Sequence, residues 1–245
     1  MHALITGVSR RAGIGFAIAR RLRDAGVDVF AHHHVAHDVE RPWGGDAIEA
    51  VLAELGDPPD LGCDLVAPGA PEALVAAAAD ALGHVDILVC NHASSGPDGG
   101  LGDLTAELID HHYAVNTRAT LLLVQAFAAQ HDGRPGGRVV LMTSGQNLGP
   151  MRGELAYAAS KGALAAITAT LSDELIDRAI TVNCVNPGPV DTGWAMPELH
   201  AAVDDRLPLG WASPDDPARL VAWLVSDEGR WITGQVLNSE GGFRR

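Results

Sequence analysis

The sequence predicts a single α/β domain built on a doubly wound, mostly parallel sheet of about seven strands. Three observations carry this prediction: short apolar runs alternate with helical patterns, 47% of the 245 residues are hydrophobic, and no linker, repeat or low-complexity tract divides the chain. Strand-helix-strand repetition forms parallel sheets covered by helices on both faces. We therefore expect one domain over residues 1–245, with ligands bound beyond the carboxyl ends of the strands.

The expected strands are short runs rich in apolar residues, separated by amphipathic or alanine-rich segments with helical spacing. In chain order they span residues 3–6, 27–32, 61–63, 87–90, 138–143, 181–185 and 235–237. A helix is expected over residues 14–25, directly after the first strand. The longest irregular stretch, residues 187–211, has the length of a lid over a ligand site.

Composition excludes several classes of protein. The net charge of −14 argues against a nucleic-acid partner, which normally requires a basic face. The N-terminus has no cationic prelude and no apolar stretch of signal length, so we expect a cytoplasmic protein without a membrane segment. Cys63, Cys90 and Cys184 end apolar runs without CxxC spacing, and we expect buried free thiols.

A glycine-rich turn joins the first expected strand to the following helix. It reads Thr6-Gly7-Val8-Ser9-Arg10-Arg11-Ala12-Gly13-Ile14-Gly15. Such a turn at a helix N-terminus presents backbone N–H groups to a pyrophosphate. Glycine is common in this chain, with 28 residues, so the motif alone is also compatible with a plain strand-to-helix turn.

Tyr157 and Lys161 lie four residues apart in an alanine-rich helical segment, which puts a phenol and an ammonium on one face. A nearby cation favours the phenolate and lowers the pKa of a tyrosine from its usual value near 10. Ser144 ends the fifth expected strand and can hold a carbonyl oxygen while the phenol protonates it. Together with the glycine-rich turn, these residues predict nicotinamide redox chemistry.

Over essentially its whole length the chain resembles the short-chain dehydrogenase/reductase (SDR) family. The turn resembles the Thr-Gly-x-x-x-Gly-x-Gly signature, with five residues instead of three between Gly7 and Gly13. Four residues match the order and spacing of the family's catalytic tetrad, namely Asn116, Ser144, Tyr157 and Lys161. The resemblance implies a Rossmann fold and reversible hydride transfer between nicotinamide C4 and a carbonyl or secondary alcohol, such as a ketone or 3-oxoacyl substrate.

Within this scheme Tyr157 is the acid/base, Ser144 holds the substrate oxygen and Lys161 bonds the nicotinamide ribose. The resemblance places Asn116 in a helical segment opened by a water that Lys161 contacts. The alternative for Asn116 is an ordinary polar helix residue.

The resemblance also implies a set of cofactor-binding residues: Gly7, Ser9, Arg10, Arg11, Gly13, Ile14, Gly15, His33, His34, Asp64, Leu65, Asn91, Ala93, Tyr157, Lys161, Pro187, Gly188, Val190 and Thr192. Asp64 resembles the residue that bonds the adenine amino group, with a turn residue as its alternative. Asn91-His92-Ala93-Ser94 resembles the family's Asn-Asn-Ala-Gly in an ambiguous register, in which either the second asparagine or the glycine is lost.

The second strand ends His32-His33-His34 and carries no carboxylate, the nearest being Asp38. NAD enzymes commonly place a carboxylate there for the adenine ribose, and Arg10 and Arg11 add cationic charge nearby. NADP(H) is therefore favoured, with NAD(H) as the alternative. The histidines, with His37, can also be read as a metal site, but no carboxylate or cysteine pattern accompanies them and we expect no metal.

The expected substrate wall is mainly apolar, with a few amides: Gln146, Asn147, Leu148, Met151, Trp194, Met196 and Leu199. No cluster of arginine or lysine is evident in these segments, although Arg152 can contact one acidic group, so a highly phosphorylated substrate is not indicated. The last strand and the Gly241-Gly242 tail resemble the family's subunit interface, which implies a homotetramer or homodimer.

Three rival functions remain. Enoyl reductases on the same fold tolerate an expanded turn but separate tyrosine and lysine by about two helical turns. A non-catalytic dinucleotide sensor would lose part of the tetrad. Epimerisation or dehydration shares the same motifs.

Overall fold

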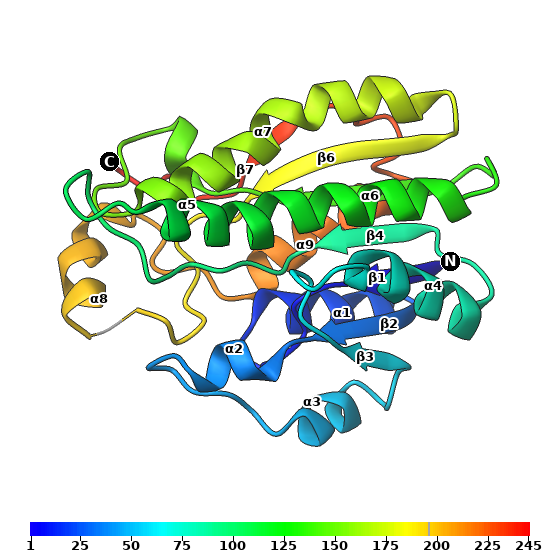
Figure 1. The fold of residues 1–245 in the computed structure, drawn as a ribbon, viewed down its shortest axis with the longest axis horizontal. Coiled ribbons are helices and arrows are strands. Elements are labelled where there is room, and N and C mark those ends of the chain that lie inside the picture. Colours follow the sequence, from blue (N-terminus) through cyan, green and yellow to red (C-terminus); the bar gives the residue numbers. More distant parts are fainter. Residues whose placement is uncertain (196) are drawn as a thin grey trace.

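A computed structural model describes residues 1–195 and 197–245, without the side chains of residues 197–199. Seven strands form one sheet in the order β3-β2-β1-β4-β5-β6-β7, and every neighbouring pair is parallel. They are β1 (His2–Ile5), β2 (Asp28–His33), β3 (Asp60–Gly62), β4 (Ile87–Cys90), β5 (Gly137–Met142), β6 (Ile180–Asn186) and β7 (Val236–Asn238). The predicted doubly wound α/β fold is confirmed (Figure 1).

Helices cover both faces of the sheet (Figure 1). They are α1 (Ile14–Asp24), α2 (Val35–Val39), α3 (Ile48–Glu54), α4 (Ala70–Leu82), α5 (Ala106–His112), α6 (Ala119–Gln130), α7 (Leu155–Ile176), α8 (Pro197–Val203) and α9 (Asp215–Val225). One apolar core packs α1, α3 and α9 against the sheet, and the other packs α4, α6 and α7 against the opposite face.

The central strands form because their side chains are apolar on both faces, as burial under two helix layers requires. All six residues of β5 are buried, as are all four of β4. Register then aligns the carboxyl ends: Ile5 pairs with Val89, Cys90 with Leu141, and Met142 with Val185. The segments that follow β1, β4, β5 and β6 therefore meet at one edge.

Two local expectations differ from the structure. The stretch 187–211 is not wholly irregular, because it contains α8 and a 3-10 turn (Asp204–Arg206). Cys63 is a free thiol, like Cys90 and Cys184, but it is only half-buried because it follows an edge strand. Among the described residues, no helix has the length and apolar character needed to span a bilayer.

Candidate active site

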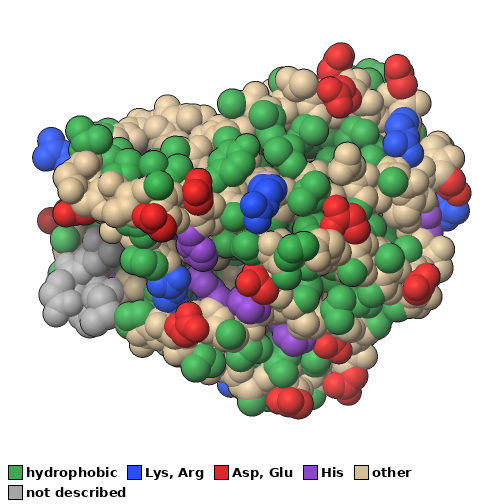
Figure 2. All heavy atoms as spheres, in the orientation of Figure 1, with side chains coloured by type: hydrophobic (Ala, Val, Ile, Leu, Met, Phe, Trp, Pro, Cys, Tyr) green, Lys and Arg blue, Asp and Glu red, His purple; other side chains and the backbone are tan. Residues whose placement is uncertain are grey.

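A large cavity opens at the carboxyl edge of the sheet, with a volume of about 1180 Å³. It is lined from the glycine-rich turn at one end to Ser144 and Tyr157 at the other. Histidine side chains gather around a hollow on this face (Figure 2). The cavity exceeds the roughly 300–1,000 Å³ of a typical small-molecule site, so it has room for a dinucleotide and a small substrate together.

The expanded turn closes on itself and comes close to β4. The Gly13 N–H donates to the Arg10 carbonyl at 3.0 Å, which starts α1. Gly7 has φ +75°, and a Cβ there would lie 2.9 Å from Asn91 Nδ2. A Cβ at Gly15 would collide with the Gly7 carbonyl. These glycines leave a cradle in which backbone can approach a pyrophosphate, so the residues present fit a dinucleotide.

Two buried histidines fix this cradle. His32 Nδ1 accepts from Gly7 N–H at 3.3 Å, and its Nε2 lies 3.0 Å from the Cys63 carbonyl. His92 Nδ1 lies 2.7 Å from Thr6 Oγ1, and its Nε2 lies 3.1 Å from the Val115 carbonyl. Burial lowers the pKa of His32 to about 4 and that of His92 to about 3, so both rings are neutral at pH 7. Each ring connects two segments of the chain by hydrogen bonds. No group of three metal-ligating side chains occurs among the described residues.

Ion pairs shape the end of the cavity beside β2, called the adenosine end because the resemblance implies that the adenosine of the cofactor lies there. Here the structure corrects the expected positive charge. Arg10 Nε lies 2.8 Å from Asp38 Oδ1, and its Nη1 donates to the Thr192 carbonyl at 3.0 Å. Asp38 Oδ1 also accepts from Trp43 Nε1 at 3.1 Å. Arg10, Asp38, Trp43 and His34 line the cavity, and Ser9 Oγ accepts from the His34 N–H at 3.1 Å.

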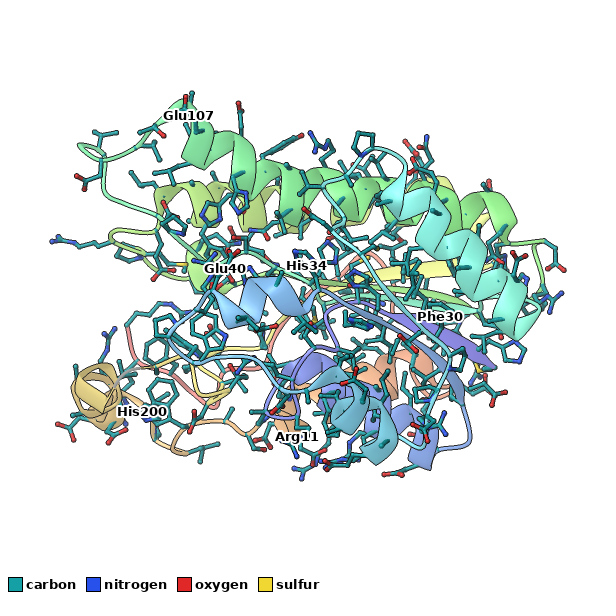
Figure 3. All side chains as sticks on the ribbon, turned by 60° about the horizontal axis from the view of Figure 1, so that its bottom comes forward. Arg11, Phe30, His34, Glu40, Glu107 and His200 are labelled. Carbon is teal, nitrogen blue, oxygen red and sulfur yellow. The ribbon has the colours of Figure 1, made fainter. Side chains whose placement is uncertain are left out.

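Arg11 and His33 lie outside the cavity lining, contrary to expectation. Arg11 is exposed and bonds Asp46 through Nη2 at 3.0 Å, and Figure 3 shows it well separated from His34. His33 points across the edge strand to Asp60, 3.0 Å away, because alternate strand residues face opposite sides. Asp64 lines the cavity but also accepts from Val66 N–H at 3.0 Å, the geometry of a turn residue.

The segment after β6 forms the wall opposite the turn. Gly188 adopts φ +71°, and its N–H donates to Asn186 Oδ1 at 3.1 Å. Val190 is buried and its carbonyl accepts from Trp194 Nε1 at 2.9 Å. Because Arg10 reaches Thr192, this wall and the glycine-rich turn are tied together across the cavity.

Ser144 and Tyr157 both line the cavity, and Lys161 lies buried below them. Lys161 Nζ donates to the Met142 carbonyl at 2.9 Å and sits 6.0 Å from the centre of the Tyr157 ring. Burial lowers the pKa of Lys161 to about 8. Burial also raises the pKa of Tyr157 to about 12, an increase that the Ser144 hydroxyl partly offsets and the nearby Glu154 carboxylate reinforces.

The expected lowering of the Tyr157 pKa is therefore not seen in this state. The physical reason is that burial of the phenol raises its pKa, while the Lys161 ammonium donates to the Met142 carbonyl and not to the phenol. At neutral pH Tyr157 is a protonated phenol, the form that donates a proton.

Asn116 lies in a π-helical turn (Tyr113–Arg118) inserted between α5 and α6, so the helix is locally opened as the resemblance implied. Its side chain is fully buried and bonds both backbone groups of Ser94, at 2.8 and 3.0 Å, and Ser160 Oγ at 2.9 Å. Ser160 Oγ in turn donates to the Tyr157 carbonyl at 2.8 Å. Asn116 thus links the loop after β4 to the helix that carries Tyr157 and Lys161.

Comparison with known proteins supports one family. The sequence profile of the family described as "Enoyl-(Acyl carrier protein) reductase" matches residues 7–244. The chain is 42% identical over 246 residues to "Uncharacterized oxidoreductase YjdA" of Bacillus subtilis (strain 168), covering 99% of this chain and 96% of that protein. It is 36% identical to a short chain dehydrogenase from Burkholderia cenocepacia J2315 solved in complex with NADP, with a TM-score of 0.86 and coverage of 98% and 96%.

The chain belongs to the short-chain dehydrogenase/reductase family. A second solved structure, of a blue fluorescent protein from a metagenomic library in complex with NADPH, is 33% identical, with a TM-score of 0.84 and coverage of 100% and 98%. Membership confirms the Rossmann fold and an oxidoreductase. Despite the description of the family profile, the enoyl-reductase alternative is not favoured, because this SDR chain keeps a gap of four residues between Tyr157 and Lys161.

Sequence reasoning missed Asp98, which holds the start of α7, the helix that carries Tyr157 and Lys161. Its carboxylate accepts from the N–H groups of Ala156 and Tyr157, at 3.1 and 2.7 Å, at the start of α7. His112 is fully buried, with Nε2 3.9 Å from Asp98 and its ring edge-on to Tyr157 at 6.1 Å. Nothing in the sequence links Asp98 to a helix more than fifty residues away, so only the fold reveals it.

The end of the cavity beside Ser144 and Tyr157, where the substrate is expected, also carries arginines from segments outside the expected wall. Besides Arg152, the cavity is lined by Arg206 from the 3-10 turn and by Phe243 and Arg245 from the C-terminal tail. Of the expected wall, Met151 and Trp194 line the cavity, whereas Gln146, Asn147 and Leu148 do not. Gln146 turns instead to Thr143 Oγ1, at 3.0 Å. Met196 and the Leu199 side chain lie outside the described residues.

Proposed function

We propose that this SDR protein is an NADP(H)-preferring carbonyl reductase or alcohol dehydrogenase that acts reversibly on a ketone or 3-oxoacyl-type substrate. One observation carries the proposal: Ser144 and a protonated Tyr157 face the same cavity as the glycine cradle. Bound nicotinamide would supply the hydride in reduction and accept it in oxidation.

The chain's own residues then divide the remaining work. Tyr157 donates the proton to the developing alkoxide, and Ser144 holds the same oxygen. Lys161 places a buried cation beneath the phenol, which stabilises negative charge as the proton leaves. Asn116 and Asp98 hold the helix that positions them.

The preference for NADP(H) is supported by the adenosine end. Asp38 Oδ1 is occupied by Arg10 and Trp43, so it is poorly placed to accept from a ribose hydroxyl as the acid of an NAD enzyme does. His34, His37 and Arg41 line the same end and offer donors to a phosphate. The NADP-bound relative supports the same preference.

The test is oxidation of NADPH and of NADH by the purified protein against a panel of ketones, β-ketoacyl thioesters, quinones and sugars. Tyr157→Phe should lower kcat by about 10²–10⁴-fold, because it removes the proton donor. Its affinity for NADPH, measured by fluorescence titration, should stay within about twofold. Turnover with NADH alone would refute the cofactor preference, and full activity of Tyr157→Phe would refute the role of the phenol.

A further inference from the structure

The C-terminal tail carries charge into the substrate end of the cavity. Residues Arg244 and Arg206 are joined by two reciprocal bonds, from Arg244 N–H to the Arg206 carbonyl at 2.9 Å and from Arg206 Nε to the Arg244 carbonyl at 2.7 Å. Ser239 N–H donates to the Asn186 carbonyl at 2.8 Å. These bonds fix the tail at Ser239 and at Arg244, and Arg245 follows directly after the second fixed point.

Two guanidinium groups flank one aromatic ring in this tail. The guanidinium carbons of Arg206 and Arg245 lie 5.0 and 5.2 Å from the centre of the Phe243 ring. All three side chains line the cavity. A Cβ at Gly145 or Gly149 would collide with Arg245, so these glycines make room for the arginine directly beside Ser144. Cationic groups stacked on a ring are held in place without losing their outward-facing donors.

The charges at this end are only partly compensated. Glu240 accepts from Arg245 Nη1 at 2.8 Å and from Asn186 Nδ2 at 2.7 Å, which lowers its pKa against the effect of burial. Among the described side chains, no carboxylate lies within 4.0 Å of Arg206 or Arg152. Glu154 and Asp98 are the other acids here, and burial together with the charge of Asp98 raises the pKa of Glu154. The guanidinium of Arg206 therefore lines the cavity without a carboxylate partner among the described side chains, and such a charge can serve a ligand.

We propose that Arg206 and Arg245, held around Phe243, bind a carboxylate of the substrate, so that the substrates are oxo acids and the corresponding hydroxy acids. A planar guanidinium fork matches a carboxylate, and the guanidinium of Arg206, which Glu240 does not pair with, suits a single negative charge. This inference depends on the proposed carbonyl reduction at Ser144 and Tyr157, and it adds the chemical class of the substrate.

The experiment compares 3-oxo-, 4-oxo- and 5-oxohexanoate, each with its methyl ester, as substrates with NADPH. At least one acid should exceed its ester by about tenfold in kcat/KM, the effect of one charge-assisted bond. Arg206→Gln should abolish that advantage by raising KM for the acid while leaving the ester unchanged. Arg244→Gln is the matched control, because Arg244 does not line the cavity, and it should leave both substrates unchanged.

Two further outcomes separate this inference from the proposed function. Equal kcat/KM for acids and esters, or equal losses for both in Arg206→Gln, would overturn the carboxylate site while leaving the reductase intact. If no compound is turned over, binding of hexanoate in the presence of NADP⁺ decides it, followed as a decrease in the fluorescence of the tryptophans, of which Trp194 and Trp211 line the cavity. Quenching by hexanoate but not methyl hexanoate, weakened in Arg206→Gln, would support the site and count against the reductase. Its absence would refute the site.

Discussion

The two ends of the cavity are built from different interactions. At the catalytic end, Asn116 and Lys161 are almost fully buried and bond backbone groups at fixed distances. At the adenosine end, long side chains form ion pairs, one partly buried between Arg10 and Asp38 and one exposed between Arg11 and Asp46. Buried polar groups are costly to leave unpaired, whereas exposed ion pairs contribute little and can exchange partners.

The difference indicates where this fold tolerates change. A substitution at the catalytic end leaves a buried polar group without its hydrogen-bond partner and without access to water, so it should lower stability as well as activity. A substitution at the adenosine end leaves groups that solvent or a phosphate can satisfy, so it should alter cofactor affinity with little effect on folding.

Lys161→Met should show the largest effect, as a change in the pH dependence of stability. Burial lowers the pKa of Lys161 from 10.5 to about 8, so the unfolded chain binds more protons between these values. The contribution of Lys161 to the free energy of unfolding therefore rises with pH, by about 3 kcal/mol from pH 7 to pH 10.5. Urea unfolding of both proteins at these two pH values measures it.

Tyr157 and Cys184 are present in both proteins, and the charge of Lys161 lowers the pKa of Cys184 in the wild type alone. Their raised pKa values, about 12 and about 11, make the unfolded chain lose protons first and so act in the opposite direction. A stability difference between wild type and Lys161→Met that does not change with pH would contradict a buried, desolvated ammonium.

Asn116→Ala should destabilise the protein by about 2 kcal/mol, because it leaves both backbone groups of Ser94 without their partner in a buried position. Asn147→Ala is the matched control: Asn147 is exposed in a 3-10 turn, and its loss should change stability by less than about 0.5 kcal/mol. Chemical denaturation gives both values. Equal effects would show that Asn116 is an ordinary polar helix residue.

The sequence predicted the parts of this molecule that follow from local pattern. All seven strands lie within about two residues of their predicted positions, because apolar runs and parallel pairing are encoded locally. Ser144 and Tyr157 line one cavity, and both positions could be predicted locally. Ser144 ends a strand, and Tyr157 lies at helical spacing from Lys161.

Long-range pairing escaped prediction for the same reason. Arg10 lies 28 residues from Asp38 and Arg245 lies about a hundred residues from Gly145, and no spacing rule joins such positions. The sequence showed the charge of Arg10 but not its partner, so it overstated the free positive charge at the adenosine end. It also missed the arginines that the tail brings to the substrate.

Asp98→Asn should lower the free energy of unfolding by about 1 kcal/mol, since it removes a negative charge from the N-terminus of α7 while keeping one oxygen acceptor. Because the Tyr157 N–H is one of the donors to this carboxylate, kcat should also fall a few-fold. Asp103→Asn is the control, an exposed aspartate in the same loop with an expected shift in Tm close to zero. A normal kcat in Asp98→Asn together with a lowered Tm would limit Asp98 to capping the helix.

Arg10→Ala and Arg11→Ala should separate the smallest effects, because the two arginines are neighbours with different surroundings. Arg10→Ala removes the bridge from the turn to Thr192 and leaves Asp38 uncompensated in the cavity wall, so the Kd for NADPH should rise by about tenfold. Arg11→Ala loses only an exposed pair with Asp46, and its Kd should change by less than about twofold. Fluorescence titration with NADPH and NADH measures both.

The two cofactors distinguish loss of structure from loss of charge. If Arg10 only holds the glycine-rich turn in place, Arg10→Ala raises the Kd for NADPH and the Kd for NADH by the same factor. If it also screens the charge of Asp38, the affinity for NADPH falls more than that for NADH, because the exposed carboxylate repels a 2′-phosphate and accepts a hydrogen bond from a free ribose hydroxyl. A larger loss for NADH would contradict both readings and would mean that Asp38 already serves the ribose in the wild-type protein.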